Sequence, residues 1–282
     1  MSTDCKLFPA KLKFPPATQD VARLVGDEHA LRLTADAVGF ERLASHAAVR
    51  VLWCFGIGDE RLEILAQCQQ LEALYLEDVR VPSLEALGAL GSLDALGVDG
   101  ATRVESLDWL AHVPALSHLR LQGLPRVHSL ESLSTQPGLK ALDVSGSTWT
   151  RMKVDSFAGL AELSELRVLY LTNIQCLDGS LDVLAGLPYL QELHIAGFYP
   201  WEEFARLSGL RPDLRCDWLE PFVELKHQSC DACGGQLVLL TGKRQPTLCR
   251  QCKADRIQRH ADRFLRVAHE AARQGAAGDP AR

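Results

Sequence analysis

The chain has 282 residues, of which 47% are apolar and 23% are charged. This composition excludes an intrinsically disordered chain, because such chains carry too few apolar residues to form a core. Residues 1–225 hold 19 Lys and Arg against 31 Asp and Glu (−12), whereas residues 226–282 hold 11 against 5 (+6). An acidic body followed by a basic tail indicates two different modules.

Targeting signals and cysteine usage bear on where the protein works. Residues 1–19 are expected to be an N-terminal extension, interrupted by prolines and without an apolar run of secretory length. No stretch of about 18 uncharged apolar residues occurs, so the sequence predicts no membrane span. The nine cysteines are an odd number, which favours a reducing compartment. We therefore expect a cytoplasmic protein.

The acidic body contains an internal repeat, and this repeat decides the fold. The pattern L-x-x-L-x-L, with some apolar replacements, recurs at steps of 22, 22, 23, 23, 27, 24 and 21 residues between Leu52 and Leu214. Its copies are Val49/Leu52/Cys54, Leu71/Leu74/Leu76, Leu93/Leu96/Val98, Leu116/Leu119/Leu121, Leu139/Leu142/Val144, Leu166/Leu169/Leu171, Leu190/Leu193/Ile195 and the weaker Leu214/Cys216. The alternation within each copy predicts a short strand.

Between these strands, leucines recur with a period of three, as in Leu84, Leu87, Leu90 and Leu93. This spacing is typical of a 3-10 or short helical segment with one buried edge. No single unit can bury its leucines alone, so successive units must stack into one continuous core. The sequence therefore predicts a solenoid with parallel strands, rather than a generic leucine-rich helical domain, which would not repeat L-x-L in every unit.

Residues 30–220 resemble the leucine-rich-repeat family, in its short bacterial, internalin-like class with repeats of about 22 residues. The resemblance implies an α/β solenoid with a parallel sheet on the concave face and 3-10 or short helical segments on the convex side. The family's strand-closing asparagine is missing, since its positions carry Ile57, Val79, Ala101, Leu124, Ser147, Ile174 and Phe198. We expect apolar packing there instead. Because an open solenoid needs both ends covered, residues 20–48 are expected to form an N-terminal cap and residues 49–225 the repeats with a C-terminal cap.

In this family the variable strand residues face the concave side, which predicts a candidate binding surface here. Its residues are Trp53, Phe55, Tyr75, Glu77, Asp99, Arg120, Asp143, Tyr170 and His194. Aromatic and arginine side chains anchor interfaces, so we expect non-catalytic binding of a protein or peptide. The alternative is that some aromatics pack against the caps and the acids form a solvated face. No nucleophile or carboxylate is paired with His194 by a recognisable motif, so we expect no enzyme.

The basic tail carries Cys230, Cys233, Cys249 and Cys252, two C-x-x-C pairs separated by 15 residues. This spacing is typical of a zinc site, because two tight turns present four thiolates to one tetrahedral ion. Residues 226–253 resemble a zinc ribbon. A fully liganded ion has no open position for water, so we expect one structural Zn²⁺. Iron in a rubredoxin-like site is the main alternative.

Residues 254–274 are expected to form an amphipathic basic helix. Its apolar stripe consists of Ile257, Ala261, Phe264, Leu265, Ala268 and Ala272. Asp255–Arg259 and Asp262–Arg266 have the spacing of intrahelical ion pairs. Packing of the stripe on the ribbon or on the last repeat is favoured. The alternative function is a nucleic-acid-associated adaptor, in which the ribbon and this helix contact phosphates. Residues 275–282 are expected to be a disordered tail.

Overall fold

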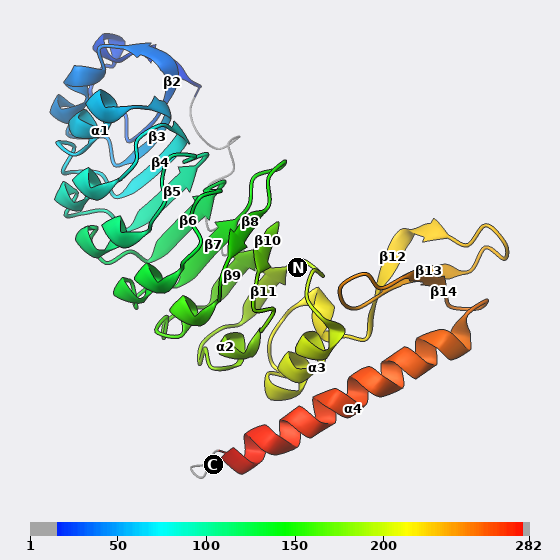
Figure 1. Ribbon diagram of the computed structural model, residues 1–282. Coiled ribbons are helices and arrows are strands. Elements are labelled where there is room, and N and C mark those ends of the chain that lie inside the picture. Colours follow the sequence, from blue (N-terminus) through cyan, green and yellow to red (C-terminus); the bar gives the residue numbers. More distant parts are fainter. Residues whose placement is uncertain (1–15, 279–282) are drawn as a thin grey trace.

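The structure, a computed structural model, describes residues 16–278. The chain forms a curved solenoid followed by a small β module and a long helix (Figure 1). A nine-stranded parallel sheet runs through the solenoid in the order β1-β2-β3-β4-β5-β6-β7-β9-β11. Its strands are β1 (Thr18–Asp20), β2 (Ala30–Val38), β3 (Val51–Ile57), β4 (Ala73–Val79), β5 (Ala95–Asp99), β6 (His118–Gln122), β7 (Ala141–Ser145), β9 (Val168–Leu171) and β11 (Glu192–Ile195). The leucine-rich-repeat solenoid predicted from the sequence is confirmed.

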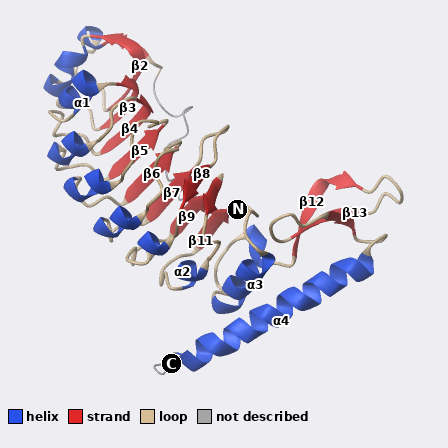
Figure 2. Cartoon of the chain, in the orientation of Figure 1, coloured by secondary structure: helices blue, strands red, loops and turns tan. Residues whose placement is uncertain are grey.

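The convex side carries short helices, one in most coils (Figure 2). The α-helices are α1 (Asp59–Leu65), α2 (Asp182–Ala185), α3 (Trp201–Leu210) and α4 (Ala254–Gly278). The 3-10 helices span Val21–Arg23, Phe40–Ser45, Glu85–Ala89, Asp108–His112, Glu131–Thr135, Ala158–Leu160 and Asp217–Leu219. The leucine spacing of three therefore predicted these segments correctly, because a 3-10 helix repeats its buried edge every three residues.

The repeated leucines hold neighbouring strands in register. Leu74 pairs with Leu96, Leu96 with Leu119, and Leu119 with Leu142. All four side chains are fully buried in one continuous core. Burial of one such side chain contributes about 1.5–3 kcal/mol, and each coil obtains it only by contact with the coils beside it.

A serine begins the helical segment in five consecutive coils, a repeat that the sequence analysis did not use. Its Oγ accepts a hydrogen bond from the backbone N–H two residues later, over 3.0–3.3 Å, at Ser83, Ser106, Ser129, Ser156 and Ser180. A short helix leaves its first N–H groups without intrahelical partners, and a serine hydroxyl satisfies one of them. Each of these serines therefore stabilises the start of the helical segment at the same position of its coil.

Each coil leaves its strand through a sharp turn. The residue two places after L-x-L is left-handed in five coils, with φ between 48° and 72°, at Gly56, Asp78, Gly100, Gly123 and Asn173. The residue after this turn residue occupies the position of the family's strand-closing asparagine, which this sequence lacks. Its residues Ile57, Val79, Ala101, Leu124 and Ile174 are fully buried, whereas Ser147 is half-buried and Phe198 is 36% exposed. Apolar packing therefore replaces the asparagines in most coils.

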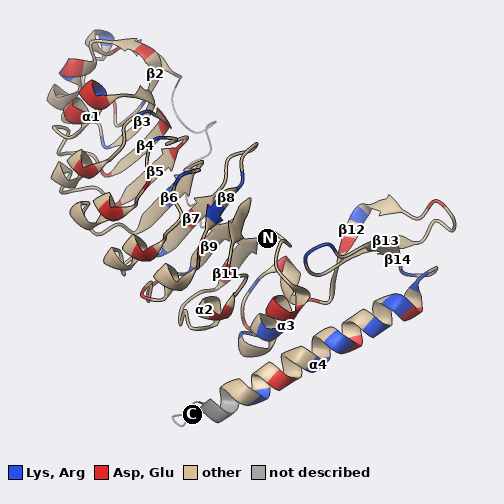
Figure 3. Cartoon of the chain, in the orientation of Figure 1, with Lys and Arg blue, Asp and Glu red and all other residues tan. Residues whose placement is uncertain are grey.

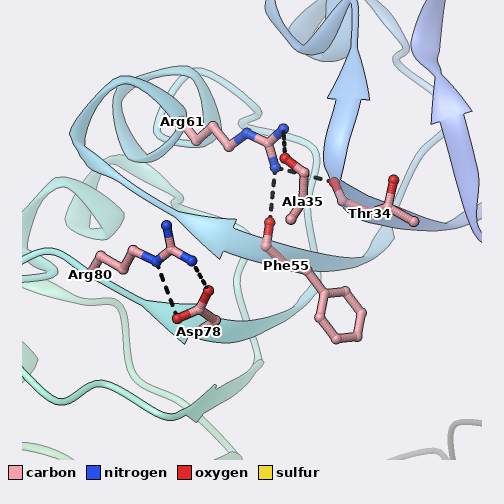
Figure 4. A network of polar contacts seen from close by, with 6 residues as sticks. All are labelled: Thr34, Ala35, Phe55, Arg61, Asp78 and Arg80. Carbon is pink, nitrogen blue, oxygen red and sulfur yellow. Dashed lines mark hydrogen bonds and ion pairs between the residues drawn. The ribbon is translucent and has the colours of Figure 1, made fainter.

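The N-terminal end of the solenoid is an atypical coil. Strand β2 continues the repeat register, with Leu31 opposite Leu52. Arg61 of α1 donates to the backbone carbonyls of Ala35 at 2.7 Å and of Phe55 in β3 at 2.9 Å (Figure 4). Its guanidinium also stacks on Phe40 at 4.8 Å. The short strand β1 adds one further strand, so residues 18 and 19 of the expected extension belong to the sheet. Residues 1–15 of that extension lie outside the described residues.

The 27-residue step between Leu142 and Leu169 corresponds to an insertion after β7. The insertion contains β8 (Met152–Val154), which pairs in parallel with β10 (Ile174–Cys176), the short strand that follows β9. Trp149, in the loop before β8, is 93% exposed. The sequence step showed the insertion but not its pairing, because three-residue strands have too little pattern to detect.

The C-terminal end differs in detail from the expected boundaries. The β module is an antiparallel sheet of β12 (Phe222–Ser229), β13 (Gln236–Leu240) and β14 (Thr247–Cys249), so it begins at Phe222 rather than at residue 226. Helix α4 runs to Gly278, beyond the expected end at 274, and residues 279–282 lie outside the described part. Phe264 of α4 is fully buried in the solenoid core. Of the expected stripe, Phe264 packs in the core of the last coil, Ile257 packs in the β module, and Ala261 and Ala268 are buried. Leu265, at 46% exposed, and Ala272 are exposed, so the expected stripe is wrong at these two positions.

Candidate functional site

The concave surface carries one continuous row of side chains, because the strands are parallel and in register. The middle strand residues are aligned pairwise across adjacent strands, in the order Arg32, Trp53, Tyr75, Gly97, Arg120, Asp143, Tyr170 and His194. A second row beside it contains Phe55, Glu77, Asp99, Gln122 and Ser145. All nine residues of the predicted binding surface therefore lie in these two rows.

The N-terminal part of the concave surface is aromatic. Trp53 stacks on Phe55, with ring centroids 5.9 Å apart and an interplanar angle of 4°, and lies 6.2 Å from Tyr75. The guanidinium of Arg32 lies 5.5 Å from the Trp53 centroid and 5.4 Å from that of Phe55. Trp53 is only 6% exposed, although its position in the middle of L-x-L predicts a ring that faces solvent on the concave side. The buried ring forms a wall of the surface rather than a free anchor.

The two rows enclose a hollow beside Gly97. Its lining includes Trp53, Tyr75, Glu77, Asp99 and Arg120, and its enclosed volume is about 30 Å³. Burial raises the pKa of Tyr75 to about 12, so its hydroxyl is protonated at neutral pH. The hollow exists because Gly97 has no side chain between those of Tyr75 and Arg120.

The centre of the concave surface is a polar network. Arg120 Nε lies 3.5 Å from Asp143 Oδ2, and its guanidinium also donates to the side-chain oxygen of Gln122. The Ser145 hydroxyl donates to the Asp143 carboxylate. Burial raises the pKa of Asp143, and the hydrogen bond from Ser145 and the charge of Arg120 oppose that rise. Partly desolvated charges of both signs therefore lie side by side here.

The C-terminal part of the surface again combines an aromatic ring with charge. Tyr170 and His194 are stacked, with ring centroids 4.1 Å apart at 11°. His194 Nε2 lies 3.7 Å from Glu192 Oε2, and Glu192 Oε1 pairs with Arg215 at 2.5 Å. Arg32 and Glu192 were not among the predicted site residues, and neither were Gly97, Gln122 and Ser145 of the two rows. The Leu31-Arg32-Leu33 triplet was a usable signal for Arg32, because it has the same L-x-L pattern.

A second candidate site is the cysteine cluster of the β module. The Sγ atoms of Cys230, Cys233, Cys249 and Cys252 all lie within 4.8 Å of one another. The separations are 3.5 Å for Cys233–Cys249, 3.4 Å for Cys233–Cys252 and 4.0 Å for Cys230–Cys252. A disulfide needs about 2.05 Å, whereas four thiolates about 2.3 Å from one tetrahedral ion are about 3.8 Å apart. The four cysteines could therefore hold a metal ion.

The protonation of these thiols follows from their surroundings. The backbone N–H groups of Cys252 and Gln251 stabilise the Cys249 thiolate and lower its pKa to about 6. The neighbouring sulfurs of Cys233, Cys249 and Cys230 raise the pKa of Cys252 to about 12. Gly234 follows the first C-x-x-C with φ +70°, and the backbone N–H of Gly235 donates to Cys233 Sγ at 3.4 Å. These contacts suit a cluster of sulfurs that share one cation.

Comparisons with known proteins address the fold alone. No protein-family model matches the chain, and no curated protein matches it. Among solved structures, an internalin (inlF) of Listeria monocytogenes has 20% identity and a TM-score of 0.41, covering 60% of this chain and 56% of that one. A leucine-rich-repeat protein (LIC12759) of Leptospira interrogans has 16% identity and a TM-score of 0.42, covering 66% and 58%. The chain thus spans little more than half the length of either.

No helix between residues 16 and 278 is both long enough and apolar enough to span a bilayer.

Proposed function

We propose that the protein is a non-catalytic binding protein that recognises a protein or peptide on its concave face. The observation that carries this proposal is the in-register row from Arg32 to His194, in which eight strands hold aromatic rings towards both ends and charged groups at the centre. Rigid strands hold these side chains at fixed spacing, so they can contact a partner with little loss of conformational entropy.

Capture of partners from the native cell extract tests this function. Tyr75→Ala and Tyr170→Ala, singly and together, should reduce recovery of the bound partner by at least about tenfold for the double variant. Tyr189→Ala is the matched control, since Tyr189 is a 55% exposed tyrosine that is not part of either concave row. Equal recovery by the double variant and the control would remove the concave face as the binding surface.

We also propose that the ion of the cysteine cluster is a single structural Zn²⁺. The sulfur separations of 3.4–4.0 Å suit a tetrahedral thiolate shell. The apolar centre of the module is small, formed by Val238, Leu240, Leu248 and Ile257 with Phe222 packed against them. A core of this size contributes little stability, and a four-coordinate ion supplies the remainder.

A cytoplasmic location is a further proposal. It is supported by Cys54, Cys68, Cys176 and Cys216, which are free thiols in the described part of the chain. Such thiols persist in a reducing compartment.

A second candidate function is binding of nucleic-acid phosphates by the C-terminal module. It is favoured by the exposed arginines of α4, Arg256, Arg259, Arg263, Arg266 and Arg273 (Figure 3). Within residues 16–278 the expected Asp255–Arg259 and Asp262–Arg266 ion pairs are not formed, and Gln258 instead donates to Asp262 at 2.8 Å. Titration with a random DNA duplex at low and at physiological salt tests this function, because phosphate contacts weaken steeply with salt. Absence of binding at low salt would eliminate it.

A further inference from the structure

A polar groove crosses three consecutive coils of the solenoid and shares no residue with the two concave rows. Its lining comes from the segments that follow β4, β5 and β6, where the chain passes from each strand toward the convex side. Its volume is about 500 Å³, which lies within the range of ligand sites. Seven of its nine lining residues are charged or carry a hydroxyl, and the other two are Pro82 and Trp109.

Trp109 brings an unsatisfied hydrogen-bond donor to this groove. Its side chain is 2% exposed, and among residues 16–278 its Nε1 has no hydrogen-bond partner. The coils on either side carry Ala86 and Ser132 at the same position, three residues after the serine that begins each helical segment. The large ring is therefore particular to the coil at the centre of the groove. Buried indole N–H groups are normally hydrogen-bonded, so this one indicates a missing acceptor.

The charged groups of the lining already have partners of their own. Arg126 Nη1 lies 2.9 Å from Glu105 Oε1, and Asp108 Oδ1 accepts from the Ser132 hydroxyl at 2.6 Å. Arg103 Nη1 donates to a backbone carbonyl at 3.0 Å. The lining combines two guanidinium groups with three carboxylates, so a charged ligand of either sign meets repulsion as well as attraction. This balance disfavours both a free phosphate and an ammonium ion.

The same groups keep much of their hydrogen-bonding capacity. A guanidinium has five N–H donors and a carboxylate accepts at about four positions, and the contacts above use only part of this capacity. A hydroxyl group both donates and accepts, so it can bridge a guanidinium and a carboxylate without breaking their ion pair. A neutral ligand with many hydroxyl groups therefore matches the lining better than an ion does.

The length of the groove suits a chain of sugar rings. Adjacent parallel strands are about 4.8 Å apart, and the rings of an extended pyranose chain repeat at a similar distance. Each coil therefore presents its polar side chains to one ring. Arg103 and Arg126 occupy equivalent positions of adjacent coils, 23 residues apart, so they repeat with the coils.

We propose that this groove binds a short neutral oligosaccharide. The sugar hydroxyls accept from Arg103 and Arg126 and donate to Glu105 and Asp108, and one of their oxygens serves as the acceptor for Trp109 Nε1. This site lies on a different face from the concave rows, so the inference does not depend on the proposed function.

NMR of the full chain labelled with ¹⁵N tests the groove through the indole signal of Trp109. Trp109→Phe identifies this signal, because it alone disappears from the spectrum of the variant. The probes are maltotriose, cellotriose, β-1,4-mannotriose and the trimer of N-acetylglucosamine. At least one should shift the Trp109 signal in a saturable manner. The proposal fails if none shifts it at about 10 mM, or if the shifts occur only at other tryptophans.

Three further probes test the ligand class. Galacturonic acid trimer carries negative charge, glucosamine trimer carries positive charge, and acetyl-Gly-Gly-Gly-amide represents a peptide backbone. Each should bind at least about tenfold more weakly than the best neutral sugar, because repulsion or lost hydroxyl contacts oppose it. Tighter binding of any of the three overturns the assignment to a neutral sugar. A Trp109 N–H that contacts bound water and responds to no sugar shows a water-filled groove, which also overturns it.

Two variants locate the contacts. Arg103→Met and Asp108→Asn should each weaken binding of the best sugar by at least about tenfold, since each removes hydrogen bonds to a charged group. Arg167→Met is the matched control, because Arg167 is exposed and does not line the groove. The thermal unfolding midpoint of each variant is measured, and Asp108→Asn decides the result if Arg103→Met is unstable. Unchanged affinity of the folded variants contradicts the site.

One comparison separates this inference from the proposed function. The Tyr75→Ala/Tyr170→Ala double variant should bind the sugar as the wild type does, since neither tyrosine lines the groove. Loss of sugar binding in this folded double variant would place the sugar on the concave face and overturn the groove assignment.

Discussion

Gly209 of α3 lies directly against the backbone of Ala268 in α4, so closely that a Cβ at position 209 would overlap the Ala268 carbonyl oxygen. This contact lets the two helices pack with their axes close together, and it brings Phe264 into the core of the last coil. The long C-terminal helix is therefore part of the solenoid's end rather than an independent arm.

The Gly209–Ala268 contact predicts the effect of a single methyl group. Gly209→Ala should force α3 and α4 apart and lower the free energy of unfolding by about 1–3 kcal/mol. Urea unfolding followed by circular dichroism measures this change. Gly138→Ala is the control, because a Cβ at Gly138 meets no atom within 4 Å. A Gly209→Ala protein as stable as Gly138→Ala would show that the close packing is unimportant.

The cysteine cluster predicts the consequence of losing a metal ligand. The purified wild type should contain one zinc ion per chain by mass spectrometry of the metal. Cys233→Ser should lose the ion, and its β module should become sensitive to protease, because metal binding and folding of so small a core are coupled. Cys216→Ser, at a half-buried thiol away from the cluster, should retain the ion. Iron in place of zinc, or a metal-free wild type, would contradict the proposal.

A buried glutamine predicts the cost of losing a hydrogen-bond bridge between coils. Gln136 is 2% exposed; its Oε1 accepts from Leu116 N at 2.9 Å, and its Nε2 donates to Leu110 O at 3.0 Å. Gln136→Met keeps the volume but leaves these backbone groups unsatisfied, so the free energy of unfolding should fall by about 2–3 kcal/mol. Gln69→Met, at an exposed glutamine, should change it by less than about 0.5 kcal/mol. If Gln136→Met and Gln69→Met unfold with similar free energies, the hydrogen bonds of Gln136 between coils do not stabilise the fold.

His260 predicts a pH dependence at the junction of α4 and α3. Its ring is buried against Trp201 at 5.6 Å, and within the described structure its Nε2 has no hydrogen-bond partner. Burial lowers the pKa of His260 below its ordinary 6.5, and nearby Arg263 acts in the same direction, whereas the Pro221 carbonyl and Glu202 oppose the shift. The folded state therefore disfavours the protonated ring, so stability is complete above the ordinary pKa and falls as the pH drops below it.

The corresponding measurement compares two proteins across pH. Between about pH 8 and pH 5 the wild type should lose more of its unfolding free energy than His260→Phe, since the aromatic replacement cannot be protonated. Parallel pH profiles for the two proteins would assign the pH dependence to other groups.

Some features of the candidate sites could be predicted from the sequence, and others depend on tertiary contacts. The residue types and spacing of the four cysteines were sufficient to predict that they converge, because each C-x-x-C is a local turn. The positions of the concave residues also followed from the repeat, since parallel strands in register align every L-x-L. What could not be predicted is which of these residues are covered. Trp53 is buried and contacts Arg32, Phe55 and Tyr75, and those contacts depend on side-chain conformations.

The sequence alone determined the solenoid and the placement of its strands, because a coil of about 22 residues can bury its leucines only against neighbouring coils with the same pattern. The tertiary structure alone decided how the solenoid ends and where its surface is hollow. The sequence shows that α4 has an apolar face that must be buried, but it does not show which element buries it. The close approach of Gly209 to Ala268 in the structure shows that this element is α3. In the same way, Gly97 becomes a pocket only when the strands on both sides place Tyr75 and Arg120 around it.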